Sequence, residues 1–147
     1  MITPRHIVVG FDDSPRSRSA LRWALVEAEA TGAEVSIVRV LAPRVAFVPA
    51  APMAPQPYGG PPRTRPDHVD DLAHEVAELA DSLGCPAPAI AQVEGRTGRV
   101  LAEAAAGADL IAIGAHHSPA YLASGVGAFA ADCLRHARCP VVIVPDW

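Results

Sequence analysis

The hydrophobic positions of this chain follow two different periods. Short runs of β-branched and other apolar residues predict strands buried on both faces, and segments with an apolar residue every three or four positions predict helices with one buried stripe. The predicted strands are residues 6–10, 34–40, 87–93, 109–113 and 141–144. The predicted helices begin near Ser14, Asp67, Thr97 and Val126. Because strands and helices alternate, the pattern indicates an α/β fold with a doubly wound parallel sheet.

Capping residues and buried stripes define the four predicted helices. Ser14 is a suitable N-cap, Pro15 suits the first helical position, and Gly32 suits the C-terminal stop. The positions expected to face the core are Leu21, Ala24, Leu25 and Ala28, widened by Trp23 and Val26, in the first helix; Val69, Leu72, Ala73, Val76, Leu79, Ala80 and Leu83 in the second; Val100, Leu101, Ala104 and Ala105 in the third; and Val126, Phe129, Ala130, Cys133, Leu134 and Ala137 in the last.

The segment from Pro43 to Pro66 interrupts this alternation. It holds eight of the fifteen prolines and shows neither hydrophobic period. Proline cannot donate to a backbone ladder, so we expect a surface loop inserted in one domain that spans residues 1–147. A functional role as a lid or a partner-binding arm stays open, because long loops are sometimes functional.

Composition and charge exclude several classes of protein. The net charge is -4, and all twelve cations are arginine, so a phosphate-binding lysine and lysine Schiff-base chemistry are excluded. The acidic balance and the scattered arginines argue against nucleic acid as a partner. No apolar run approaches the roughly 20 residues of a membrane span, so no membrane partner is expected. The chain lacks a signal-peptide pattern and has three scattered cysteines, which favours a cytoplasmic location.

Two loops are suited to a ligand. In an open parallel sheet, ligands bind beyond the carboxyl ends of the strands, where the strand order reverses. Residues 10–14 follow the first predicted strand with an acidic turn, and residues 114–127 follow the fourth with Gly114, Gly125 and Gly127 before a helix. Free N–H groups at a helix start favour an anion such as phosphate. If the two strands are neighbours, the loops together predict a nucleotide site.

Three stretches carry a family resemblance over nearly the whole chain. They are Ile7-Val-Val-Gly-Phe-Asp-Asp-Ser14, Ala108-Asp-Leu-Ile-Ala-Ile-Gly114 and Leu134-Arg-His-Ala-Arg-Cys-Pro-Val-Val-Ile-Val144. Together they resemble the signatures of the universal stress protein family. The resemblance implies an adenine-nucleotide alpha-hydrolase-like fold, a five-stranded sheet in the order 3-2-1-4-5 with helices on both faces. It also implies homodimers joined through the last strand, and ATP binding in some members.

The resemblance maps onto the predicted nucleotide site residue by residue. The ATP-binding members have Gly, two residues, Gly, nine residues, and Gly followed by Ser or Thr. Gly114 and Gly127 match the first and third glycines, whereas the second falls on His117 and the hydroxyl position on Ala128. On the adenine side, Asp12, which follows Gly10 and Phe11, matches the acidic residue on the adenine side of the family's site. Val40 matches a residue of the second strand whose backbone contacts adenine. We therefore expect ATP or another adenine nucleotide to bind weakly, with the loss on the phosphate side.

The last predicted strand suggests how copies of the chain associate. Val141, Val142, Ile143 and Val144 are four consecutive β-branched residues, and as an edge strand they would leave unpaired backbone groups. Pairing with a twofold copy removes that hazard, as the resemblance also implies. We expect a homodimer through these four residues.

Other chemistry is less well supported. Gly125, Gly127 and Ala130 resemble a dinucleotide fingerprint with Asp146 downstream, but about ten residues separate them from the preceding strand. Cys133, His136 and Cys139 have ligand-like spacing without an evident fourth ligand, so no metal is predicted. A triad of Ser118 or Ser124 with the loop histidines and Asp12 lacks the nucleophile elbow. Adjacent Asp12 and Asp13 more commonly brace a turn than act as a catalytic pair.

Three functional hypotheses follow. The leading one is a non-enzymatic stress-response regulator that binds an adenine nucleotide weakly. The first alternative is a dimeric interaction module that binds no nucleotide and uses residues 43–66 on a partner. The second alternative is a weak ATP hydrolase.

Overall fold

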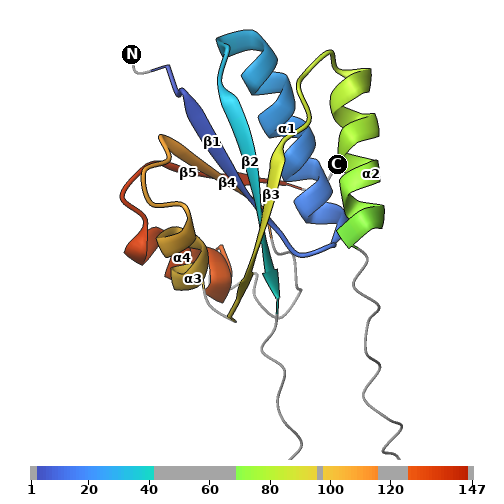
Figure 1. The fold of residues 1–147 in the computed structure, drawn as a ribbon. Helices are drawn as coiled ribbons and strands as arrows, with labels where there is room; N and C mark the ends of the chain where they lie inside the picture. Colours follow the sequence, from blue (N-terminus) through green and yellow to red (C-terminus); the bar gives the residue numbers. More distant parts are fainter. Residues whose placement is uncertain (1–2, 42–68, 96–97, 116–125, 146–147) are drawn as a thin grey trace, which may run out of the picture.

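A five-stranded parallel sheet forms the centre of the molecule, with helices on both faces (Figure 1). The computed structural model describes residues 3–41, 69–95, 98–115 and 126–145. The elements are β1 (His6–Phe11), α1 (Pro15–Thr31), β2 (Glu34–Leu41), α2 (Val69–Ser82), β3 (Ala89–Glu94), α3 (Gly98–Ala104), β4 (Leu110–Gly114), α4 (Ala128–His136) and β5 (Val141–Val144). The predicted loop at 43–66 and the predicted caps Asp67 and Thr97 lie outside the described residues.

The strand order is β3-β2-β1-β4-β5, and every neighbouring pair is parallel. This confirms the fold class and the order that the family resemblance implied. β1 lies at the centre, where Ile7 pairs with Val35 of β2 and with Leu110 of β4. β3, which has the least apolar sequence of the five strands, is one edge strand, and β5 forms the other edge.

Alternate residues of each strand face two separate hydrophobic clusters. One cluster lies beneath α1 and α2 and contains Ile7, Val9 and Phe11 of β1 with Leu25 and Val76 of the helices. The other lies beneath α3 and α4 and contains Val8, Val38, Leu101, Ile113 and Cys133. Figure 1 shows the corresponding layers, with α1 and α2 on one side of the sheet and α3 and α4 on the other. Burial of both sheet faces explains why the central strands β1 and β4 are nearly continuous apolar runs.

The first helix has the predicted ends. Ser14 accepts a hydrogen bond from Ser17 N, Pro15 begins the helix, and Gly32 ends it with a φ of 73°. A left-handed backbone conformation costs little free energy at glycine, because glycine has no Cβ. None of the helices within the described ranges is both long and apolar enough to cross a bilayer.

Several predicted stripe positions are wrong. Val26 does not widen the stripe of α1, because its side chain is about half exposed. Ala73 and Ala104 are also exposed, and Ala102 takes the core position in α3. Each of these residues is next in sequence to a buried one, and the 3.6-residue period of the helix turns its side chain away from the buried stripe.

The last helix differs most from its prediction. α4 begins at Ala128, so Val126 precedes it and is exposed, as are Phe129 and Leu134. Ala130 and Cys133 alone among the predicted stripe residues are fully buried, and Ala137 is partly buried. α4 packs mainly against α3, where Gly98 lies against the backbone of Phe129 and Cys133, so a narrow stripe of α4 is buried and the larger neighbours of that stripe are exposed. Phe129 lines the cavity described below.

Candidate functional site

A cavity of about 490 Å³ opens at the carboxyl ends of β1 and β4. The strand order reverses between these two strands, because the chain winds from β1 to β2 on one side and reaches β4 on the other. The cavity is lined by Gly10, Phe11, Asp12, Ser14, Arg16, Ser17, Val40, Gly95, Ile113, Gly114, Ala128, Phe129 and Ala130.

The structure brings most of the predicted site residues together. Gly10, Asp12, Val40, Gly114 and Ala128 all line the cavity, although they come from four different segments of the chain. Gly127 is buried immediately before Ala128, at the N-cap of α4. His117 lies outside the described residues.

The acidic turn after β1 is organised by hydrogen bonds around Asp12. Ser14 N donates to Asp12 Oδ1 at 3.0 Å, and Ser17 N donates to Ser14 Oγ at 3.2 Å, so the turn leads directly into the cap of α1. Partial burial alone would raise the pKa of the Asp12 carboxyl, but hydrogen bonds with Ser14 and Ser17 and the charge of Arg16 outweigh burial and lower it. The carboxylate is therefore ionised at neutral pH and acts as an acceptor.

Asp13 has a different role from its neighbour. Its Oδ2 accepts from Arg39 Nε at 3.1 Å and from Arg39 Nη2 at 2.5 Å. Asp12 lines the cavity and Asp13 does not. The two adjacent carboxylates therefore do not form a pair that could act on one substrate.

The first turn of α4 faces the cavity without a capping side chain. Gly127, at φ 86° and ψ 159°, is the N-cap, and Ala128, Phe129 and Ala130 line the cavity. A helix start carries partial positive charge and N–H groups that lack intrahelical partners. This side of the cavity therefore suits an anion, while the Phe129 ring offers an apolar surface.

The first turn of α1 is a lining element that the sequence prediction missed. Arg16 and Ser17 line the cavity next to Gly114. A Cβ on Gly114 would lie 2.5 Å from both the backbone C and O of Arg16, so glycine here permits the close approach of α1 to the end of β4. A signal was present in the sequence, because a cation in the first turn of a helix opposes the helix dipole and needs another explanation.

The competing constellations do not assemble among the described residues. No three His, Cys, Asp or Glu side chains in those ranges converge as metal ligands. His136 Nδ1 lies 2.8 Å from the Asp132 carbonyl oxygen, and burial raises the pKa of the Cys133 thiol to about 11. The loop histidines, Ser118, Ser124, Gly125 and Asp146, which belong to the less well supported alternatives, lie outside the described residues.

Comparisons with known proteins agree with this architecture. A universal stress protein of Mycobacterium tuberculosis is 31% identical over 144 residues, which are 95% of this chain and 47% of that protein. This chain thus spans about half the length of the curated relatives it matches.

Two solved structures share the fold. A universal stress protein in complex with cAMP superposes with a TM-score of 0.71 at 21% identity. The superposition covers 99% of this chain and 100% of the chain in that structure. The universal stress protein from Archaeoglobus fulgidus in complex with dAMP superposes with a TM-score of 0.55 at 20% identity. The superposition covers 97% of this chain and 99% of the chain in that structure.

The model of the universal stress protein family matches residues 3–145, nearly the entire chain. The strand order, the cavity at the strand reversal and this match agree with one another. The chain belongs to the universal stress protein family.

Proposed function

We propose that the cavity binds an adenine nucleotide, and that the chain is a cytoplasmic, non-enzymatic regulator of a stress response. The observation that carries this proposal is the meeting of Asp12, Val40 and the first turn of α4 around one cavity at the strand reversal. Its volume of about 490 Å³ falls within the range of roughly 300–1,000 Å³ typical of small-molecule sites.

The adenine side of the proposed site combines an acceptor with apolar walls. The ionised Asp12 carboxylate can accept from an exocyclic amine or a ribose hydroxyl. Val40, near the end of β2, lines the same cavity, where its backbone groups can form hydrogen bonds with the edge of a base. Ile113 and Phe129 supply apolar contact. A flat aromatic base fits such a mixture of apolar surface and a few polar groups.

The phosphate side is weaker. The start of α4 and the nearby Arg16 favour an anion, but Ala128 has no hydroxyl to donate to a phosphate. His117 carries a Cβ where the family motif has glycine, and a Cβ disfavours backbone with positive φ. The solved relatives that contain cAMP and dAMP support this proposal, because each ligand carries a single phosphate.

Calorimetric titration tests the proposed function directly. We expect the native chain to bind adenosine and AMP, and Asp12→Ala to weaken both by about ten- to hundredfold, since a hydrogen bond to a charged group is worth roughly 1.5–3 kcal/mol. Guanosine serves as the control, because its base carries a carbonyl oxygen at the ring position where adenine carries its exocyclic amine. If millimolar adenosine and AMP both fail to bind, the interaction-module alternative replaces this proposal.

A phosphate-release assay separates the regulator from the hydrolase. The proposed regulator should release no phosphate from ATP above the rate of a buffer blank. Release that Asp12→Ala abolishes would favour the hydrolase.

We also propose that two copies of the chain join through β5. Val141, Val142 and Ile143 remain partly exposed at this sheet edge. The carbonyls of Pro140 and Val144 accept from Ile111 N of β4 and from Ala115 N, immediately after β4. Since backbone groups alternate in direction along a strand, those of Val141 and Ile143 face away from β4, toward a second copy.

Ile143→Pro should convert the dimer to monomer or aggregate. Proline removes an N–H that faces the edge, and leaves the β4 ladder in place. Sedimentation velocity measures the change, and Ile143→Thr, which keeps both the N–H and the β-branched shape, should stay dimeric. A dimeric Ile143→Pro variant would show that the copies associate through another surface.

A further inference from the structure

The turn that carries Asp12 is held in an unfavourable backbone conformation. Among the described residues, Asp13 is the one non-glycine residue with positive φ, at 63°. Left-handed backbone brings the Cβ of an L-residue too close to a neighbouring carbonyl, and persists where surrounding contacts enforce it. The contacts around Asp13 therefore need to be identified.

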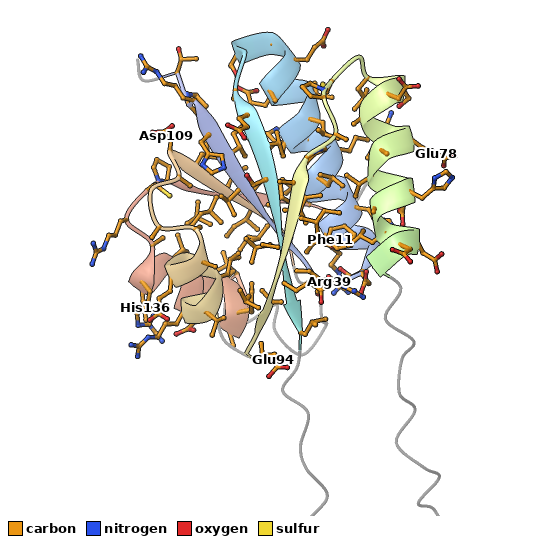
Figure 2. All side chains as sticks on the ribbon, viewed as in Figure 1. Phe11, Arg39, Glu78, Glu94, Asp109 and His136 are labelled. Carbon is orange, nitrogen blue, oxygen red and sulfur yellow. The ribbon has the colours of Figure 1, made fainter. Side chains whose placement is uncertain are left out.

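Two arginines hold Asp13 by different groups. Arg39 of β2 donates twice to the Asp13 carboxylate, at 3.1 and 2.5 Å, from a side chain that is 7% exposed. Arg18 of α1 donates from Nη1 to the Asp13 backbone carbonyl at 2.7 Å, and is itself held by Glu75 of α2. Figure 2 shows Arg39 close to Phe11, near the carboxyl ends of the strands and on the side of α1 and α2. We call the contact of Arg39 and Arg18 with Asp13 the Asp13 clamp.

The Asp13 clamp joins the two segments that form the adenine side of the cavity. Asp13 directly follows Asp12, and Arg39 directly precedes Val40. Phe11 and Arg39 are paired residues of the adjacent strands β1 and β2. A displacement of Asp13 relative to Arg39 would therefore change the distance between Asp12 and Val40, the two residues proposed to recognise the base.

We propose that Arg39 is a positioning residue for the nucleotide site: by holding Asp13 in left-handed backbone it fixes Asp12 opposite Val40. This inference rests on the proposed function for its ligand. Arg39 does not line the cavity, so it acts through the turn. The same contact explains why a charged side chain is almost completely buried near the end of a largely apolar strand.

A matched pair of double variants tests the backbone role. Arg39→Met with Asp13→Ala and Arg39→Met with Asp13→Gly both remove the ion pair and both charges, and they differ at position 13 only by a Cβ. Glycine adopts the left-handed conformation readily without the Arg39 ion pair, whereas alanine does so at a cost; the contact of Arg18 with the backbone carbonyl of residue 13 is available in both variants. We expect the alanine variant to bind adenosine about tenfold more weakly than the native chain, and the glycine variant to bind within about threefold of it.

Hydrogen exchange gives a readout that does not need a ligand. Ser14 N donates to Asp12 Oδ1 across the turn, so protection of this amide reports the turn geometry. It should be lost in the alanine variant and kept in the glycine variant. Arg99→Met, which removes an exposed ion pair with Glu103 on α3, is the control and should change neither measurement.

Each outcome decides the proposal. If both double variants bind and exchange like the native chain, or if the glycine variant is as impaired as the alanine variant, the positioning role of Arg39 is wrong. If the native chain binds no adenine compound, the proposed function fails, yet the exchange of Ser14 N still decides whether Arg39 holds the turn.

Discussion

Gly114→Ala is expected to destabilise the folded chain by about 2–3 kcal/mol, the upper part of the usual range for overpacking. The new Cβ would lie 2.5 Å from the backbone C and O of Arg16 and 2.7 Å from its Cβ. These atoms belong to the first turn of a long helix, so a change of rotamer cannot relieve the clash. α1 would have to shift away from β4, with which it shares the core.

Thermal unfolding followed by circular dichroism measures this effect. For a chain of this length we expect the melting temperature to fall by about 5–10 °C. Gly10→Ala is the matched control, because the Cβ there would meet Leu101 Cδ2 at 2.6 Å, the movable end of a side chain. It should cost less than Gly114→Ala. Equal melting temperatures for the native chain and Gly114→Ala would show that the contact between α1 and β4 is adaptable.

The double variant His117→Gly with Ala128→Ser is expected to tighten ATP binding by about ten- to hundredfold, from one restored hydrogen bond to a charged group. Ala128 lines the cavity at the start of α4, where a serine hydroxyl could donate to a phosphate. Glycine in place of His117 would remove the Cβ that disfavours positive φ. Adenosine has no phosphate, so its affinity should change little.

Calorimetry with ATP and adenosine on both proteins measures the difference. Ala104→Ser, at an exposed position of α3, is a control that adds a hydroxyl away from the cavity. Micromolar ATP binding by the native chain would contradict the expected weakness of the phosphate side. A double variant no tighter than the native chain would show that the departures at His117 and Ala128 do not limit binding.

These two variants address different uses of glycine. By its place in the motif, Gly114 was predicted to belong to a phosphate-binding loop. The structure shows a second constraint on Gly114, because the backbone of Arg16 occupies the space that a Cβ at this position would need. A glycine needed for packing and a glycine needed for a ligand look the same in a sequence, because both are defined only by an absent side chain.

The sequence by itself determined the elements and their general arrangement. Continuous β-branched runs identified the strands, including the central β1 and β4, because strands buried on both faces need apolar residues at every position. Ser14, Pro15 and Gly32 marked the ends of α1, because caps are satisfied by groups within a few residues. Asp12, Val40 and Ala128 were predicted from the resemblance to the universal stress protein family, and they converge on one cavity.

Only the tertiary structure decided how neighbouring residues divide their roles. Asp12 and Asp13 are adjacent residues of the same type, and their local pattern gives them no separate roles, yet one lines the cavity and the other binds Arg39, 26 positions away. Phe129 has the spacing of a core residue, but it is exposed and lines the cavity, because Ala130 and Cys133 are the residues of α4 buried against α3 and the sheet. Such roles depend on contacts between distant segments, and local periodicity and capping report only on residues within a turn or two of one another.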